Sequence, residues 1–118
     1  MQGNRDEAVV ERILRYCQQT TAAHQDFGCS KERFLQSTTY QNAVCMCVLQ
    51  IGELIGKLSE GFRIEHSEIP WHKIRGMRNF VAHEYGKLDL EIVWFTATRS
   101  IPELEQFCSR WLEAHKKP

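Results

Sequence analysis

An arginine, an amide, an imidazole and a phenol lie within eight residues of one another, at Arg78, Asn79, His83 and Tyr85. A guanidinium is permanently charged and planar, and it can hold a phosphate through two parallel hydrogen bonds. An imidazole can remove or deliver a proton near neutral pH. Together these groups suit cleavage of RNA through attack by its own 2′-hydroxyl, a reaction that requires no metal ion.

The segment that carries these side chains is predicted to form a helix from about Ile69 to Gly86. Pro70 fits its first turn, where a missing backbone N–H costs nothing. A helical wheel at about 100° per residue then separates two faces. The core-facing stripe contains Ile74, Met77, Val81 and Tyr85. The opposite, polar row contains His72, Arg75, Gly76, Asn79 and His83.

Two interpretations of this polar row are open. A polar row on a helix is commonly a solvated face, and its spacing alone fits that interpretation. However, the row has no Asp or Glu between positions 74 and 82, and it contains Gly76, a poor helix former. These two features favour a surface that contacts a substrate, with Arg75 and Asn79 supporting the bound phosphate.

Arg78 and His83 are the candidate catalytic residues, but one straight helix does not easily aim both at one small substrate. They are five positions apart, which corresponds to an angle of about 140° on the wheel. A two-fold homodimer that pairs this helix with its copy would bring Arg78, Asn79 and His83 of both chains into one cleft. We therefore expect a homodimer in which two histidines divide the roles of general base and general acid.

The remaining segments predict further helices and no strand. Apolar residues recur every three to four positions in the segments expected to be helical. These helices span about residues 4–24, 31–59, 69–86, 90–99 and 102 onward, with a polar connection at 60–69 and a break at 100–102. The expected fold is a single domain, residues 1–118, built as an all-α bundle of about five helices.

Two glycines in the central helix, Gly52 and Gly56, lie four positions apart and therefore on one face. Each costs up to about 1 kcal/mol of helix propensity relative to alanine, so they predict a close contact between helices that a side chain would block. Glu53, beside them, is a single acid in an apolar run. It either faces solvent or orients a cation across the helix interface.

The composition excludes several classes of protein. Fifteen Lys and Arg residues balance fifteen Asp and Glu residues, so the chain has no overall basic field and any contact with RNA must be local. The N-terminal segment lacks the pattern of a signal peptide, and the longest apolar region, Ala43–Leu58, is interrupted by Glu53 and Lys57. We expect a cytoplasmic protein without a membrane segment.

Cysteine and histidine spacing gives no indication of a metal or redox centre. The five cysteines, at positions 17, 29, 45, 47 and 108, are expected to be free thiols in a reducing compartment. The five histidines do not form any of the common zinc-binding patterns. No metal site and no cofactor are predicted.

The segment Arg78–Tyr85 resembles the R-x4-H-x-Y signature of HepT-type HEPN toxins. The similarity extends in order over about residues 5–115, although Glu84 departs from the family pattern, in which glycine is frequent. The other similar segments are Ile51-Gly52-Glu53, Lys57-Leu58-Ser59, Ile69-Pro70-Trp71, Ile74-Arg75-Gly76-Met77, Leu88-Asp89 and Ile92-Val93-Trp94.

The resemblance implies a small helical homodimer that acts as a metal-independent endoribonuclease, the toxin of a type VII-like toxin–antitoxin system, with mRNA or tRNA as its target. Arg78 and His83 would occupy the catalytic positions, and Asn79 the polar position after the arginine. Tyr85 would correspond to the tyrosine to which a minimal nucleotidyltransferase antitoxin adds AMP, silencing the toxin.

Two alternatives belong to other functional classes. One is a non-catalytic HEPN subunit that binds a nucleotide or assists a nucleotidyltransferase partner, using Arg78 and His83 only to hold phosphate. The other is a helical interaction module whose polar row is simply solvated.

Overall fold

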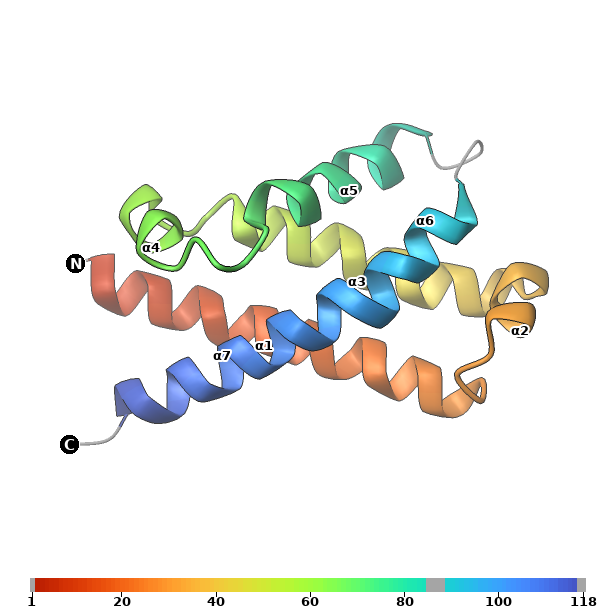
Figure 1. Cartoon of the computed structure of the whole chain (residues 1–118), viewed down its shortest axis with the longest axis horizontal. Coiled ribbons are helices and arrows are strands. Elements are labelled where there is room, and N and C mark those ends of the chain that lie inside the picture. Colours follow the sequence, from red (N-terminus) through yellow and green to blue (C-terminus); the bar gives the residue numbers. More distant parts are fainter. Residues whose placement is uncertain (1, 85–88, 117–118) are drawn as a thin grey trace.

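Every long segment with helical periodicity forms a helix in the computed structural model (Figure 1), which describes residues 2–84 and 89–116, without the side chains of residues 2–4, 80 and 82–84. The described residues contain no strand, so the all-α prediction is confirmed. The elements in order are α1 (Gln2–Asp26), α2 (Lys31–Gln36), α3 (Thr38–Ile55), α4 (Glu60–Glu65), α5 (Trp71–Glu84), α6 (Leu90–Phe95), a π-helical turn η2 (Thr96–Ser100) and α7 (Ile101–Lys116).

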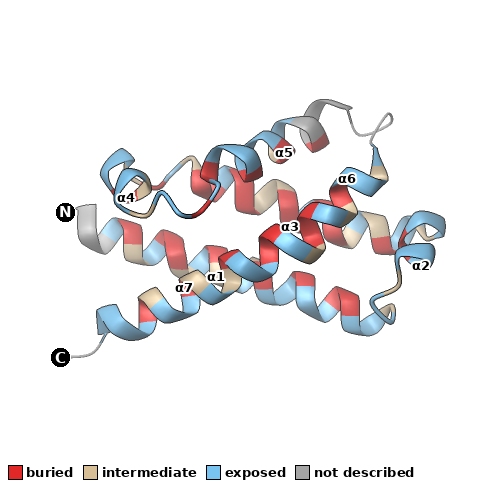
Figure 2. Ribbon diagram, viewed as in Figure 1, coloured by how far each residue is buried: buried red, intermediate tan, exposed pale blue. Residues whose placement is uncertain are grey.

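The long helices α1, α3 and α7 form the frame of the bundle. Helix α1 packs against both α3 and α7, and α5 lies along α3, where the two form the most extensive contact between any pair of elements (Figure 1). Buried residues lie on the inward side of each helix, as Figure 2 shows. The bundle is elongated, with extents of 46 × 27 × 20 Å.

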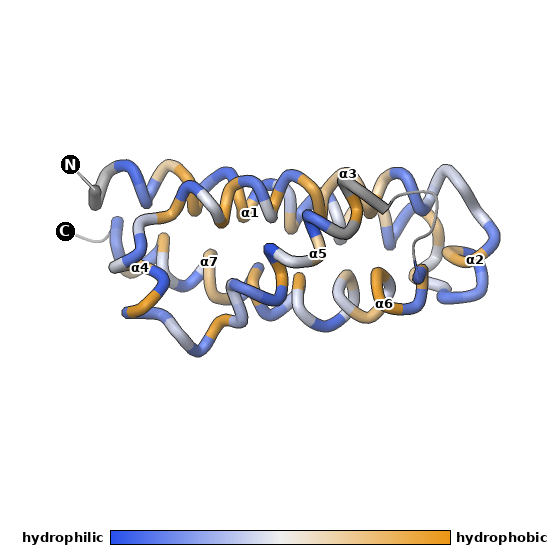
Figure 3. The backbone as a smooth tube through the Cα atoms, turned by 90° about the horizontal axis from the view of Figure 1, so that it is seen from above, coloured by the Kyte–Doolittle hydropathy of each residue, from blue (hydrophilic) through white to orange (hydrophobic). Residues whose placement is uncertain are grey.

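The core consists of two apolar clusters that share α1, α3 and α5. One contains Ile13, Ile55 and Ile74 together with residues of α4 and α7. The other contains Tyr40 and Val81 together with residues of α2 and α6. Apolar positions recur along the helices rather than running continuously (Figure 3). Within the described residues, no helix combines the length and apolarity needed to cross a membrane.

The prediction of one uninterrupted helix over residues 31–59 is wrong. Ser37 is extended, with φ −106° and ψ 111°, and it separates α2 from α3. Its backbone N–H bonds to the Arg33 carbonyl, and its hydroxyl accepts a hydrogen bond from the Tyr40 N–H at 3.1 Å. Ser37 therefore caps both helices, a role that favours serine over continuation of the helix.

Residues 60–69, predicted as a polar connection, contain the short helix α4, and Ser59 is its N-cap. The Ser59 hydroxyl accepts a hydrogen bond from the Phe62 N–H at 3.1 Å. The buried Asp6 carboxylate of α1 accepts bonds from the Ser59 N–H at 2.8 Å and from its hydroxyl at 2.7 Å. This long-range cap fixes α4 against α1, and no local sequence signal predicts it.

The predicted break at residues 100–102 is also wrong, because α6, η2 and α7 form one continuous helical path. The Ile101 N–H bonds to the Thr96 carbonyl, five residues back, as in a π-helix. A proline removes one backbone donor and crowds the preceding turn, so the wider turn just before Pro102 lets the helix pass through it. Asp89 caps the start of α6, since its carboxylate accepts a hydrogen bond from the Glu91 N–H at 3.0 Å.

Candidate active site

The candidate site is built where α5 crosses α3 at Gly52. A Cβ added to Gly52 would lie 2.0 Å from the Cβ of Arg78, far closer than two such atoms can approach. The crossing lies between the two apolar clusters, because Ile74 belongs to the first and Met77 to the second. The close contact predicted from Gly52 is therefore present, and the residue opposite it is Arg78.

The acid beside this glycine orients Arg78. The Arg78 Nε donates a hydrogen bond to Oε1 of Glu53, and Nη2 forms an ion pair with the same oxygen. The Arg78 side chain is 30% exposed and that of Glu53 is 44% exposed, so both groups remain accessible from solvent. Of the two interpretations of Glu53, the structure supports contact with a cation across the interface.

Asn79 completes the arrangement around the guanidinium. Its side-chain oxygen, Oδ1, accepts a hydrogen bond from Arg78 Nη1 at 2.7 Å, while the residue itself is exposed. A guanidinium has five N–H donors, and this arrangement engages one on each nitrogen. One donor on each terminal nitrogen is left for a further oxygen acceptor, as bidentate binding of a phosphate would require.

The polar row predicted on α5 is exposed where the structure describes it. His72, Arg75, Gly76 and Asn79 all face solvent, whereas Ile74, Met77 and Val81 are buried as predicted. Arg75 does not join the cluster of Arg78, Asn79 and Glu53. Its guanidinium lies against Gly56, the residue that follows α3, where an added Cβ would be 3.1 Å from Nη2.

The two remaining candidates are beyond the described side chains. His83 belongs to α5, but its side chain is outside the description, and Tyr85 lies outside the described residues altogether. The pairing of Arg78 with His83 and the role of Tyr85 therefore remain predictions.

Cysteines do not contribute a reactive thiol to this cluster. Burial raises the pKa of Cys45 to about 11, and burial together with the nearby Glu105 raises that of Cys108 to about 12. All five cysteines are free. Among the residues described, no group of three or more His, Cys, Asp or Glu side chains is arranged to hold a metal ion.

The profile of the family described as "Ribonuclease HepT-like" matches residues 7–111, and the chain belongs to that HEPN ribonuclease family. No solved structure gave a significant match.

Several relatives carry ribonuclease names. "Putative RNase TTE0752" of Caldanaerobacter subterraneus subsp. tengcongensis is 34% identical over 91% of this chain and 94% of its own length. "Putative RNase MJ0125" of Methanocaldococcus jannaschii is 33% identical over 64% of this chain and 65% of its own length. "Probable ribonuclease HepT" of Thermococcus cleftensis is 34% identical over 63% of this chain and 67% of its own length.

The contact at Gly52 predicts opposite effects of two glycine substitutions. Gly52→Ala should lower the free energy of unfolding by about 1–3 kcal/mol, because the new methyl group collides with Arg78. Gly76→Ala, in α5, should raise it by up to about 1 kcal/mol, because no atom lies within 4 Å of its added Cβ and alanine favours the helix. Urea unfolding of both variants measures this difference. Equal stability of the two variants would show that α3 and α5 are not in such close contact.

Proposed function

We propose that two copies of this chain form a metal-independent endoribonuclease that cleaves mRNA or tRNA. The observation that carries the proposal is the fixed guanidinium of Arg78, held by Glu53 and Asn79 in a chain of the HepT-like ribonuclease family. An arginine whose guanidinium is already oriented, and which has unused N–H donors, is suited to stabilising the negative charge that builds on a phosphate in the transition state. The ribonuclease names of the relatives support the same class of reaction.

The proposed reaction is an internal transesterification. His83 of one chain removes the proton from the 2′-hydroxyl, whose oxygen attacks the adjacent phosphorus. The bond from phosphorus to the 5′-oxygen breaks, and His83 of the partner subunit protonates that leaving oxygen. The products are a 2′,3′-cyclic phosphate and a 5′-hydroxyl, and the terminal N–H groups of Arg78 stabilise the transition state.

Two copies are needed in this proposal because Arg78 and His83 are five positions apart, which corresponds to about 140° on a helical wheel. A two-fold axis close to α5 would place both sets of residues in one cleft. Asn79 then orients the guanidinium, and Arg75 binds the RNA backbone beside the reacting phosphate.

The proposal includes control by a partner protein. A minimal nucleotidyltransferase acting as the antitoxin would transfer AMP from ATP to the Tyr85 hydroxyl, releasing pyrophosphate. Tyr85 follows His83 by two residues. A nucleotide attached there would add bulk and negative charge at the cleft, and both would exclude RNA.

Catalysis by Arg78 and His83 predicts that purified protein cuts single-stranded RNA in the presence of EDTA. His83→Ala should lower the cleavage rate by about 10²–10⁴-fold, and Arg78→Ala by about 10²–10³-fold. The measurement is gel analysis of end-labelled RNA, with identification of cyclic phosphate ends.

Exposed residues on other helices provide the matched controls. Arg12→Ala on α1 and His115→Ala on α7 remove the same kinds of side chain and should leave cleavage unchanged. Sedimentation should show the same dimer for all four variants. Wild-type cutting rates in the His83→Ala protein would overturn the proposal.

Control by the antitoxin predicts one modified tyrosine. After incubation with its partner transferase and ATP, the peptide containing Tyr85 should gain the mass of one AMP, and RNA cleavage should stop. Tyr85→Phe should remain active and unmodified under the same conditions, with Tyr16→Phe on α1 as the control that is still modified. An inactivated protein that carries no adduct on Tyr85 would contradict this mode of control.

A further inference from the structure

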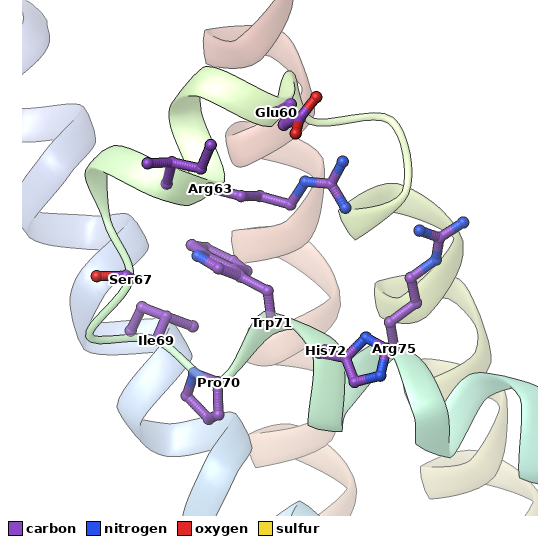
Figure 4. A pocket seen from close by; sticks show the side chains of 9 residues that line it. Glu60, Arg63, Ser67, Ile69, Pro70, Trp71, His72 and Arg75 are labelled. Carbon is purple, nitrogen blue, oxygen red and sulfur yellow. The ribbon is translucent and has the colours of Figure 1, made fainter.

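A pocket of about 600 Å³ opens between α4 and the start of α5, beside the candidate active site. Figure 4 shows its side chains, which come from α4, the following connection and the first turns of α5. Its volume falls within the usual range of small-molecule sites. The lining residues that determine its chemistry are Arg63, Ile69, Trp71, His72 and Arg75.

One side of this pocket is cationic. Arg63 of α4 is half-buried, and its Nε is shielded from solvent without a hydrogen-bond partner among the described residues. Arg75 and His72 of α5 line the same pocket, against a single acid, Glu60 (Figure 4). α5 also begins here, with no acidic residue in its first turn, so the positive end of its dipole adds to the field.

The other side is apolar and rigid. Ile69 is 8% exposed and Trp71 is 7% exposed, and both line the pocket. Trp71 is fixed by a hydrogen bond from its Nε1–H to the His66 carbonyl at 3.0 Å. Ile64 extends the apolar surface at 68% exposure. This arrangement matches the two parts of a nucleotide, because the cationic side suits its phosphate and the apolar side suits its base and ribose.

The pocket lies next to the candidate catalytic arginine. Arg75 lines it and precedes Arg78 by three residues, which is about 4.5 Å along the helix axis. Gly56, just after α3, leaves room for the Arg75 guanidinium, and Gly52 of α3 leaves room for Arg78. The two arginines thus lie about one helical turn apart on α5, each against a glycine, a spacing suited to consecutive parts of one strand.

We infer that this pocket binds one nucleotide of single-stranded RNA next to the bond that is cut, with its phosphate on Arg63 and Arg75. The inference rests on the proposed ribonuclease function and adds a substrate subsite to it. Arg63 is the residue that distinguishes the subsite from the catalytic cluster, because it comes from α4 rather than α5.

Binding can be tested without cleavage by using a fluorescent 2′-O-methyl oligonucleotide, which has no 2′-hydroxyl to attack. Arg63→Ala should weaken binding about 5–10-fold, and loss of one phosphate contact should lower the slope of log K against log salt by about 0.7. Arg63→Lys keeps the charge and should keep the slope while losing part of the affinity. Arg12→Ala is the charge-matched control on α1 and should bind like the wild type.

A second measurement on the unaltered protein avoids any effect of substitution on folding. The chain has three tryptophans, Trp71, Trp94 and Trp111, whose indole N–H signals heteronuclear NMR can follow separately. Adding the oligonucleotide should shift the signal of Trp71 much more than that of Trp94, which packs against His24 and Tyr40 in the other cluster.

The outcomes separate this inference from the proposed function. If wild-type protein cuts RNA but Arg63→Ala binds the oligonucleotide as Arg12→Ala does, and Trp71 does not shift, the subsite is refuted and the ribonuclease stands. If the pocket binds AMP but not the oligonucleotide, it is a site for a free nucleotide, and the inference is wrong. Cleavage that fails while the oligonucleotide still shifts Trp71 would overturn the proposed activity and support the subsite.

Discussion

The close approach of α3 and α5 at Gly52 is the constraint on which the site depends. A side chain at this position would collide with Arg78 and force the helices apart. Glu53 follows Gly52 directly and holds the guanidinium of Arg78. With both groups partly exposed, such an ion pair contributes only about 0–1 kcal/mol to stability. The ion pair matters mainly because it orients the guanidinium and leaves terminal N–H groups free for a phosphate.

Charge is arranged locally in a chain whose formal net charge is zero. Glu53 offsets part of the charge of Arg78, whereas Arg63 and Arg75 share their pocket with one acid, Glu60. Attraction of RNA by the whole molecule would therefore be weak, and the contacts must come from a few fixed arginines. In the proposed function, such a site would contact a short single-stranded segment of the target RNA between α4 and α5.

Helix periodicity predicted the all-α class, the buried stripe of α5 and the contact at Gly52, because each depends on residues one helical turn apart. The break at Ser37 and the short helix α4 within residues 60–69 were missed, since a serine in a polar segment is compatible with both a helix and a cap. The break predicted at Pro102 was wrong, because the π-helical turn that accommodates the proline has no clear sequence signal. The pocket was not predicted because Arg63, Trp71 and Arg75 come together only in the folded chain, where α4 and the start of α5 line one cavity. Asp6 of α1 helps to fix the start of α4 through Ser59.

The central claim is that two chains build one catalytic cleft, in which both copies of His83 take part. Its most direct test is to mix wild-type and His83→Ala chains in equal amounts, exchange subunits by unfolding and refolding, and measure RNA cleavage against an equal total amount of wild-type protein. If both histidines are needed, only dimers of two wild-type chains are active, and random pairing leaves about a quarter of the activity. Retention of about half of the activity would show that each chain cuts RNA with its own residues and would contradict the account.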